Sequence, residues 1–577
     1  IGGAGRPPRL RAGIVLGVVS VALLLLAARL CKLQIGEADR YRRLARQQQQ
    51  LDRKLSARRG RIYDRQGRLL AASVRRWSIY ADPKAVKDPD RTALVVGNVL
   101  GRSPGGLARS LRKDCFFVWI KRQVSEREAE RVRDLALPGV YLQEENKRLY
   151  PQGRLGAHVV GFTDIDGRGL AGIERKMDAL LRGRPGLERV LCDGGRRIFR
   201  SAQDRLQKAP FNGYDVFLTL DAYVQNVAEQ ELAAAAEKHE PECATAIVMD
   251  VRDGSVLAMA SWPSFDPQEP AQSPVGYQRN VAVSDAYEFG SAFKPITVGL
   301  ALEQGVVAPD TEFECHQGEW RVGRRTVHDV HPYGTLTVSD ILCHSSNIGA
   351  GQVGQKLGPQ KLHEGIRGFG LGRPTGIALP GEVGGIMRPV ASWSEYSIIS
   401  IAFGQELAVT AMSMARAFAS FANGGVLLQP RIVKAVVHSH TGKVVYTAGE
   451  PSVSTRPLSA ETAGEVLRMM QRVVTEGTGR PARLDEYVIA GKTGTAQLLR
   501  QDGKGYSSSR YLSTFIGVAP VPDCRIVVLV TVKAPTRNGY YGSVVAAPVV
   551  RNITLRTLRH MNVPQTESTD VALGETG

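Results

Sequence analysis

The first apolar stretch of the chain runs without a charge from Ala12 to Ala28 and is rich in valine and leucine. At about 1.5 Å per residue it is about 25 Å long, and a helix extended to Leu33 crosses a hydrocarbon core of about 30 Å. Arginines precede the stretch (Arg6, Arg9 and Arg11), which indicates a cytoplasmic N-terminus by the positive-inside rule. We therefore predict a cytoplasmic segment over residues 1–11 and a single transmembrane helix over residues 12–33.

A cleaved signal peptide is the alternative interpretation of this stretch. The apolar run is longer than a usual signal-peptide core, and no small-x-small cleavage site follows it. The retained anchor is therefore favoured, and it places the rest of the chain on the outer side of the membrane.

Short alternating segments follow the anchor. Polar and apolar residues alternate from Leu69 to Tyr80, which is typical of strands and hairpins. Residues 85–135 carry a helical pattern, with glutamates among arginines on a solvated face. We interpret residues 34–210 as one extended domain.

A different pattern begins near Asn212. Residues 214–220 are typical of a strand, and residues 222–239 are typical of an amphipathic helix that begins after the N-cap Asp221. Two apolar runs then flank Asp253-Gly254, which predicts a hairpin.

A second hairpin is predicted near the other end of the chain, around residues 520–523. Strands at both ends with helices between them indicate an α+β fold on an antiparallel sheet flanked by helices. We assign this second domain to residues 211–560, and residues 561–577 form a polar tail.

Charge separates the two parts of the chain. The formal net charge is +19, but residues 1–210 hold 44 lysines and arginines against 21 acids, while the remainder holds 31 against 35. The N-terminal third therefore carries a balance of +23. Nucleic acid is a poor partner for this segment, since the anchor places it outside the cytoplasm. Contact with anionic lipid or cell-wall polymer is a hypothesis that rests on charge alone.

The seven cysteines show neither a C-x-x-C pair nor a regular spacing, so their pairing cannot be deduced. Cys315-His316, with His328 and His331, offers metal-ligand chemistry. No pair among them shows a recurrent zinc spacing, and we interpret the segment as a polar loop. We predict no metal site.

The most informative segment is Y-E-F-G-S-A-F-K-P, which contains Ser291 and Lys294. Ser291 is placed to begin a helix, and a lysine three residues further on shares the same helix face. A lysine amine at that spacing can take the serine proton if burial or a nearby charge lowers its pKa. Alone, this S-x-x-K pattern is weak evidence, because chance matches are expected in a chain of this length.

Two further motifs change that assessment. S-S-N lies at residues 345–347, and K-T-G-T lies at residues 492–495. The order S-x-x-K, S-x-N, K-T-G is that of the penicillin-recognising serine enzymes. A hydroxyl at Ser345 can pass a proton to a leaving amine, and the Asn347 amide can hold a substrate backbone.

The K-T-G-T segment supplies recognition groups. Lys492 offers a cation and Thr493 a hydroxyl for a terminal carboxylate. Gly494 lets a strand edge approach the substrate closely. The backbone N–H groups of Ser291 and Thr495 are candidates for an oxyanion hole.

From Leu16 to Arg551 the chain resembles the class B penicillin-binding proteins. The segment R-G-R-I-Y-D-R at residues 59–65 looks like the first pedestal box of that family, R-L-Y-P at residues 148–151 like the second, and G-L-A-G-I-E at residues 169–174 like the third. The tight turns of these boxes are expected to shape the pedestal rather than to perform chemistry. Phe289 departs from the family pattern, which usually has proline there.

The resemblance implies a peptidoglycan D,D-transpeptidase that acts through an acyl-enzyme on Ser291 and requires no cofactor. Its substrates would be stem peptides ending in D-Ala-D-Ala, and penicillins would acylate the same serine. Asn347 and the pedestal boxes look more like the septal, cell-division type or its sporulation relative than the elongation type. The resemblance further implies a catalytic domain outside the cytoplasmic membrane. It also implies binding to a polytopic glycosyltransferase and division proteins.

Three other functions share part of this pattern. A serine β-lactamase or membrane β-lactam sensor carries the same motifs, and the long pedestal argues against both. A D,D-carboxypeptidase usually lacks this pedestal. An inactive division scaffold would not need the intact serines and lysines of the three motifs.

Overall fold

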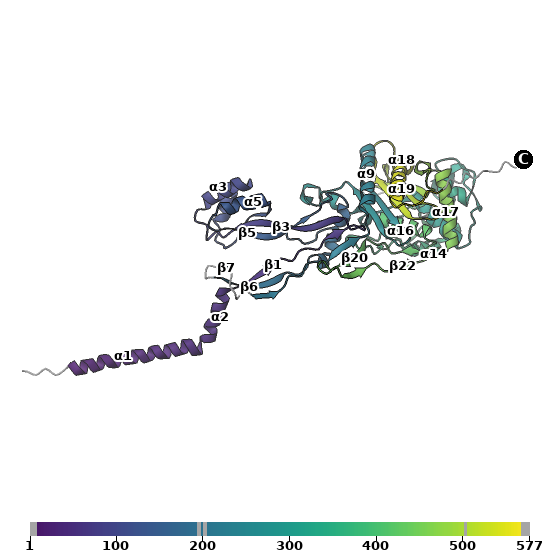
Figure 1. Ribbon diagram of the computed structural model, residues 1–577. Coiled ribbons are helices and arrows are strands. Elements are labelled where there is room, and N and C mark those ends of the chain that lie inside the picture. Colours follow the sequence, from purple (N-terminus) through teal and green to yellow (C-terminus); the bar gives the residue numbers. More distant parts are fainter. Residues whose placement is uncertain (1–7, 193–197, 200–204, 501–504, 567–577) are drawn as a thin grey trace, which may run out of the picture. The chain divides into compact units, whose positions relative to one another are not determined.

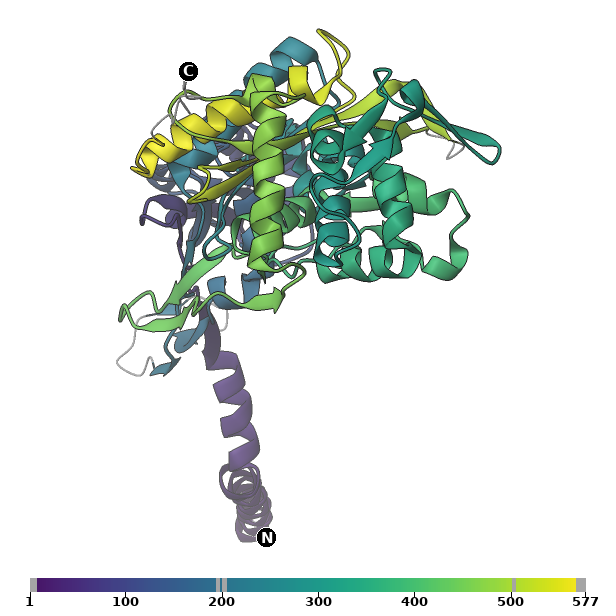
Figure 2. The same cartoon turned by 90° about the vertical axis from the view of Figure 1, so that its right-hand side faces the viewer.

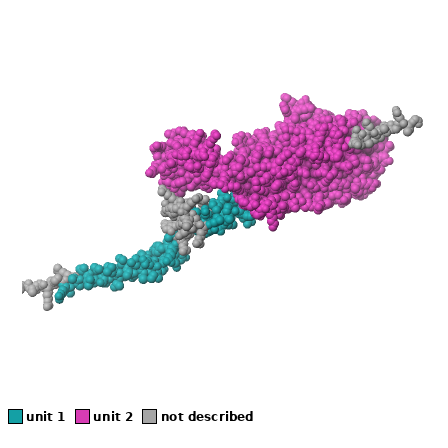
Figure 3. Space-filling view, viewed as in Figure 1, with its two compact units in different colours: residues 1–57, 183–211 teal, residues 58–182, 212–577 magenta. Residues whose placement is uncertain are grey.

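The computed structural model describes residues 8–192, 198–199, 205–500 and 505–566. Residues 1–7 of the predicted cytoplasmic segment and residues 567–577 of the predicted polar tail lie outside this described part. The chain divides into two compact units (Figure 3), one of residues 1–57 and 183–211 and the other of residues 58–182 and 212–577.

The first unit contains the apolar helix. α1 (Pro8–Cys31) continues through a π-helical turn (Lys32–Gly36), and α2 (Ala38–Gln49) follows. Ala12–Gly36 is long and apolar enough to cross a membrane, and none of its most apolar window is buried. The predicted span over residues 12–33 lies inside this segment.

A small antiparallel sheet completes the first unit. β1 (Gln50–Leu55) pairs with β6 (Gly186–Cys192), which also pairs with β7 (Ile198–Phe199) and β8 (Arg205–Lys208). Strands from both ends of the predicted 34–210 domain therefore meet in this sheet.

The second unit contains a seven-stranded sheet that joins distant parts of the chain. Its order is β21-β20-β9-β2-β3-β4, with β5 also paired to β3. The strands are β2 (Ile62–Tyr63), β3 (Leu69–Ala81), β4 (Val118–Val124), β5 (Val140–Leu149), β9 (Asp215–Leu218), β20 (Val433–Val437) and β21 (Val444–Thr447). β9 runs parallel to β2 and antiparallel to β20.

Three helices pack on one end of this sheet. α3 (Pro89–Leu100), α4 (Pro104–Leu111) and α5 (Glu126–Asp134) share a core with Ile79 and Ile120. The prediction of a helical segment over residues 85–135 is therefore wrong in part, because β4 lies between α4 and α5. Pairing with β3 fixes β4 as a strand, and a charged sequence such as V-W-I-K-R-Q-V does not reveal that pairing.

A five-stranded antiparallel sheet forms the centre of the C-terminal part, in the order β11-β10-β25-β24-β23. The strands are β10 (Cys243–Asp250), β11 (Val256–Trp262), β23 (Ala490–Leu499), β24 (Tyr506–Ala519) and β25 (Ile526–Lys533). Both predicted hairpins, β10–β11 and β24–β25, are confirmed. β23 is an edge strand, and β24 is its partner in this sheet among the described residues.

Helices cover both faces of this sheet. α9 (Ala222–His239) and α19 (Ala547–His560) lie on one face and α16 (Ala411–Ala422) on the other (Figure 1). The alternation of strand side chains explains the two layers, since Val528 packs with α9 and α19 while Leu529 packs with α16. The predicted α+β fold with an antiparallel sheet flanked by helices is confirmed.

A helical layer beside β23 carries the segments that matter for chemistry. It contains α11 (Lys294–Glu303), α12 (Val338–His344), α13 (Asn347–Leu357) and α17 (Ala460–Thr475), which is light green in Figure 2. α17 packs against β23, α11 and α12. The three motifs therefore come from neighbouring elements.

The pedestal boxes meet in a buried ionic network. Arg59 Nε donates to Glu174 at 2.6 Å, and Arg148 Nε donates to the other oxygen of the same carboxylate at 2.6 Å. Arg59 also donates to Asp178 at 2.6 Å, and Arg148 donates to the carbonyl oxygen of Gly60 at 2.7 Å. Glu174 is fully buried. The boxes thus join three distant segments, a role that goes beyond the tight turns expected from sequence.

Candidate active site

Ser291 lies in a 3-10 turn, Gly290–Phe293, which we call the Ser291 turn and which runs directly into α11. The helix therefore begins at Lys294, three residues later than the sequence indicates. Gly290 starts the turn with φ of +52° and donates its N–H to the carbonyl oxygen of Gly404 at 3.1 Å. The Ser291 side chain is half-buried, and its hydroxyl makes no hydrogen bond within the described part of the chain.

Lys294 is fully buried and follows the Ser291 turn as the first residue of α11. Its Nζ donates to the backbone oxygen of Ser345 and to Asn347 Oδ1, the latter at 2.8 Å. The Ser345 hydroxyl lies 3.3 Å from the same amine. The first two motifs therefore meet through this lysine.

Lys492, which lies on β23, contacts the same serine. Its Nζ donates to Ser345 Oγ at 2.8 Å and to the backbone oxygen of Thr493 at 3.3 Å, and its side chain is fully buried. Ser345 lies between α12 and α13 in the left-handed region, with φ of +64°. A non-glycine residue in this conformation is strained, and such strain is often found at functional sites.

β23 packs closely against the Ser291 turn. A Cβ added to Gly494 would lie 2.7 Å from the carbonyl oxygen of Phe289 and 3.0 Å from Ala292 Cβ, so glycine permits this approach. Thr493 Oγ1 shares a hydrogen bond with Thr478 Oγ1 at 2.9 Å. Thr495 Oγ1 accepts the N–H of Gly542 at 3.0 Å.

Burial controls the charge of the two lysines. Desolvation, and next the neighbouring Lys492, hold the pKa of Lys294 well below its ordinary value of 10.5, while Asp329 acts in the opposite direction. Desolvation also lowers the pKa of Lys492, to about 7. A neutral Lys294 amine can accept a proton, and Lys492 can gain or lose one near neutral pH.

The structure therefore brings the predicted residues of all three motifs to one place. Ser345 contacts both lysines, Asn347 contacts Lys294, and residues 493–495 follow Lys492 along the strand beside the Ser291 turn.

Several residues of this site carry no recognisable motif. Asp329 accepts hydrogen bonds from Ser346, Asn347 and Ile348, and it comes from a loop that sequence reasoning treated only as polar. Thr478, beside Thr493, is likewise far from any motif in the sequence. No spacing rule links these positions to their partners.

Glu288 is a further residue that sequence reasoning left without a role. It comes just before the Ser291 turn, and its carboxylate accepts the N–H of Glu406 at 3.0 Å and the hydroxyl of Tyr506 at 2.8 Å. Burial raises the pKa of this carboxyl. Glu288 therefore ties the Ser291 turn to β24 and to the 404–406 loop.

A cavity of about 560 Å³ adjoins these segments. Tyr287 and Glu288 line it from the side of the Ser291 turn, and residues 497–499 line it from the end of β23. Charged side chains on its wall include Glu242, which is paired with Arg510 at 2.5 Å and with Lys533 at 3.2 Å. The cavity therefore lies between the segment that precedes the Ser291 turn and the end of β23.

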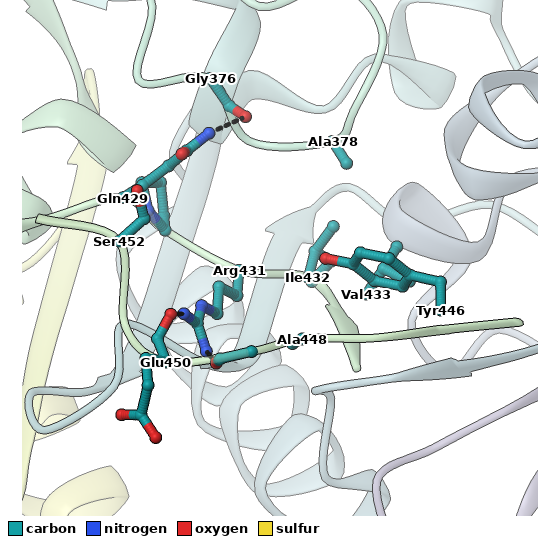
Figure 4. Close-up of a pocket in the computed structure, with 12 residues that line it drawn as sticks. Gly376, Ala378, Gln429, Arg431, Ile432, Val433, Tyr446, Ala448, Glu450 and Ser452 are labelled. Atoms are coloured by element: carbon teal, nitrogen blue, oxygen red, sulfur yellow. Dashed lines mark hydrogen bonds between the residues drawn. The ribbon is translucent and has the colours of Figure 1, made fainter. Parts of the chain in front are cut away.

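A second cavity, of about 270 Å³, shares no residue with the three motifs (Figure 4). Arg431 donates to the carbonyl oxygen of Gly449 at 2.7 Å and to that of Glu450, and Gln429 donates to the carbonyl oxygen of Gly376 at 3.2 Å. The polar groups of its wall thus bond to each other. Nothing in this arrangement resembles a nucleophile with its base.

Among the described residues, no group of three or more His, Cys, Asp or Glu side chains is arranged to hold a metal ion. The Cys315 thiol lies 3.5 Å from Ser346 Oγ, and His328 lies near Glu319 at 3.8 Å.

Comparison with known proteins agrees with this geometry. Residues 244–555 match the penicillin-binding protein transpeptidase domain, and residues 54–218 match the penicillin-binding protein dimerisation domain. The chain is 34% identical to "Probable peptidoglycan D,D-transpeptidase PenA" of Neisseria meningitidis, covering 90% of this chain and 88% of the relative. It is 33% identical to "Stage V sporulation protein D" of Bacillus subtilis (94% and 84%) and 31% identical to "Peptidoglycan D,D-transpeptidase FtsI" of Escherichia coli (96% and 92%).

Solved structures give the same result. A peptidoglycan synthetase from Bifidobacterium adolescentis superposes with a TM-score of 0.71 at 27% identity, covering 90% of this chain and 98% of the other. Penicillin-binding protein 3 of Mycobacterium tuberculosis, in complex with aztreonam, gives 0.69 at 29% identity, covering 89% and 98%. The chain belongs to the penicillin-binding proteins. Its dimerisation and transpeptidase domains place it among the class B members.

Proposed function

We propose that this protein is a peptidoglycan D,D-transpeptidase that forms an acyl-enzyme on Ser291. The observation that carries the proposal is the meeting of the three motifs. Lys294 and Lys492 both contact the hydroxyl of Ser345, and β23 packs against the turn that presents Ser291. The names of the relatives, PenA and FtsI among them, support the same reaction.

The proposed reaction gives each of these groups a role. Ser291 Oγ attacks the carbonyl carbon of the penultimate D-Ala, and its proton passes to the neutral amine of Lys294. The new ester forms as the C–N bond to the terminal D-Ala breaks, and Ser345 delivers a proton to the leaving amine. An amine of a neighbouring strand then attacks the ester, releases Ser291 and completes the cross-link.

Recognition uses the edge of β23. Lys492 and Thr493 bind the terminal carboxylate of the stem peptide, and Asn347 holds its backbone through the amide. Backbone N–H groups of Ser291 and Thr495 stabilise the oxyanion. The rest of the stem peptide extends along the strand toward the cavity lined by residues 497–499.

The same comparisons support a place for this reaction. Relatives named FtsI and stage V sporulation protein D favour septal wall synthesis in cell division, with sporulation as the related role. The apolar segment Ala12–Gly36 supports a single-pass anchor in the cytoplasmic membrane, with the catalytic part outside. In that setting the partners are a polytopic glycan-polymerising glycosyltransferase and other division proteins.

A labelled penicillin tests the reaction directly. We expect intact-mass measurement to show one adduct on the full-length wild type that persists for hours, because penicillin mimics the D-Ala-D-Ala terminus. Ser291→Ala is expected to form none, and Lys294→Ala is expected to lose acylation because the proton acceptor is gone.

The matched control is Ser392→Ala, an exposed serine outside the three motifs that should keep the adduct. Loss of the wild-type adduct within minutes would indicate a β-lactamase instead, and a wild type without any adduct would indicate a scaffold. Acylation retained by Lys294→Ala would exclude this lysine as the proton acceptor.

A further inference from the structure

One carboxylate holds three successive residues, the last two of the S-S-N motif and the Ile348 that follows them. Asp329 Oδ1 accepts the backbone N–H of Asn347 and that of Ile348, the latter at 3.1 Å, and Asp329 Oδ2 accepts the hydroxyl of Ser346 at 2.5 Å. Ser346 is itself the N-cap of α13, where its oxygen accepts the N–H of Gly349 at 2.9 Å. The carboxylate therefore lies where the dipole of an eleven-residue helix favours negative charge.

The same loop orients the Asn347 side chain. Asn347 Nδ2 donates to the carbonyl oxygen of His328 at 2.9 Å, which leaves Oδ1 for the amine of Lys294 at 2.8 Å. The backbone and the amide of Asn347 are thus both fixed by residues 328–329. Only one orientation of this amide satisfies both neighbours.

The backbone conformation of Ser345 requires support from neighbouring residues. Its left-handed conformation is costly for a residue with a side chain, and such a turn persists only when its surroundings determine it. The amines of Lys294 and Lys492 both contact Ser345. Asp329 binds the residues that follow it, so the motif is held between two lysine amines and a carboxylate.

We propose that Asp329 is a positioning residue that holds Ser345 and Asn347 in the geometry required for acylation. The proposal rests on the transpeptidase function proposed above and assigns no substrate contact to Asp329. It acts through Ser346 and through the N-terminus of α13.

The electrostatics add a measurable signature. The titratable groups that act on the Lys294 amine are Lys492 on β23, Asp329 in the loop after β15 (Arg325–His328) and the buried thiol of Cys315. Asp329 raises the pKa of Lys294 against the larger effects of burial and Lys492. Without the negative charge of Asp329, the Lys294 amine loses its proton at lower pH. The acidic limb of the pH profile of the acylation rate therefore moves to lower pH.

The test separates the non-covalent binding of penicillin from the first-order acylation step, over a range of pH, in the full-length protein. Asp329→Ala is expected to slow acylation about 100-fold, since small misplacements of reacting groups have effects of that size. Asp329→Asn keeps one acceptor oxygen and is expected to slow it about tenfold. In both variants the binding constant should change less than about threefold, because Asp329 does not touch the ligand.

Glu319→Gln is the matched control, since Glu319 is an exposed carboxylate on β14 (Glu319–Val322), which pairs with β15. It should leave both constants and the pH profile unchanged. Weaker binding with a normal acylation step in Asp329→Ala would contradict the proposal, as would an acidic limb that does not move. An equal loss in Glu319→Gln would also contradict it. If Asp329→Ala does not fold, Asp329→Asn is compared with the wild type in the same way. A wild type that penicillin does not acylate would contradict the proposed function and not the role of Asp329.

Discussion

Two lysine amines share one serine hydroxyl, and this is the central fact at the scale of single residues. Both side chains are fully buried, so each charged form is costly, and two adjacent cations are costlier still. The result is a Lys294 whose pKa lies well below its ordinary value and a Lys492 whose pKa lies at about 7. Burial thus favours the neutral form of both amines.

The lowered pKa of Lys492 predicts how stability varies with pH. Between pH 7 and 10.5 this amine is neutral in the folded protein and protonated in the unfolded chain, so the unfolded state binds more protons. The free energy of unfolding should therefore rise with pH across this window, by at most about 1.4 kcal/mol per pH unit from this group. Lys492→Met is expected to reduce that rise to the part that the lowered pKa of Lys294 contributes, which urea unfolding at pH 7.5, 8.5 and 9.5 would measure.

Lys361→Met is the control for this measurement, because Lys361 is an exposed lysine on α14 (Pro359–Gly368). Its pH dependence should match the wild type. The same slope in Lys492→Met and in the wild type would show that the buried amine does not lose its proton in the folded protein.

The sequence alone could identify the residues of this site only where a fixed spacing along the chain links them. Ser291 and Lys294 share a short turn, so their proximity follows from local geometry. Asp329 and Thr478 approach the site through a loop and a helix end, and their partners are fixed by tertiary packing. Nothing in the local sequence distinguishes Asp329 from the other charged residues of a polar loop.

Among the elements, β23 is the edge strand of its sheet and packs against the Ser291 turn. Gly494 permits this close packing, since its backbone lies against Phe289 and Ala292. The strand and the turn are therefore placed by direct contact.

Adding a single methyl group tests this contact. In Gly494→Ala the new Cβ would lie 2.7 Å from the carbonyl oxygen of Phe289, so either the strand or the turn must shift. We expect penicillin acylation to slow about tenfold or more, since reacting groups tolerate little displacement. We also expect stability to fall by about 1–3 kcal/mol, as for other overpacked sites.

Gly464→Ala on α17 is the companion variant, because its Cβ would meet nothing closer than Arg468 Nη1 at 3.9 Å. It should acylate normally and gain up to about 1 kcal/mol of stability from better helix propensity. Normal acylation in Gly494→Ala would mean that the strand and the turn are not coupled.

Elements were predictable where turn chemistry marks them. The hairpin β10–β11 has Asp253-Gly254 at its turn, and α9 has the N-cap Asp221, whose side chain accepts the N–H of Tyr223. β4 has no such marker. Its strand conformation comes from pairing with β3, and two helices separate these strands along the chain. Non-local pairing is the part of this fold that local pattern does not reveal.

At the scale of the whole molecule, the pedestal boxes are connected by the network of Arg59, Arg148 and Glu174. Three segments separated by up to 115 positions converge on one buried carboxylate. Removing Arg59 leaves the buried Glu174 with Arg148 alone and takes from Asp178 its 2.6 Å ion pair, and the loss of a partner from a buried ionic network is the costly case.

Arg59→Ala is therefore expected to lower the free energy of unfolding by about 3–5 kcal/mol. Urea unfolding of the full chain, followed by tryptophan fluorescence, would measure the loss. Arg75→Ala removes an exposed pair with Glu144 (3.0 Å) and should change stability by less than about 1 kcal/mol. Similar losses in the two variants would mean that the network contributes no more than a surface ion pair.

The left-handed backbone of Ser345 limits how this enzyme can escape its inhibitors. Glycine is the residue that relieves such a conformation, yet glycine has no hydroxyl and would remove the atom that both lysines contact. The chain cannot relax this turn and keep that hydroxyl. We therefore expect drug-resistant variants to leave position 345 unchanged and to alter the loops and strand ends around it.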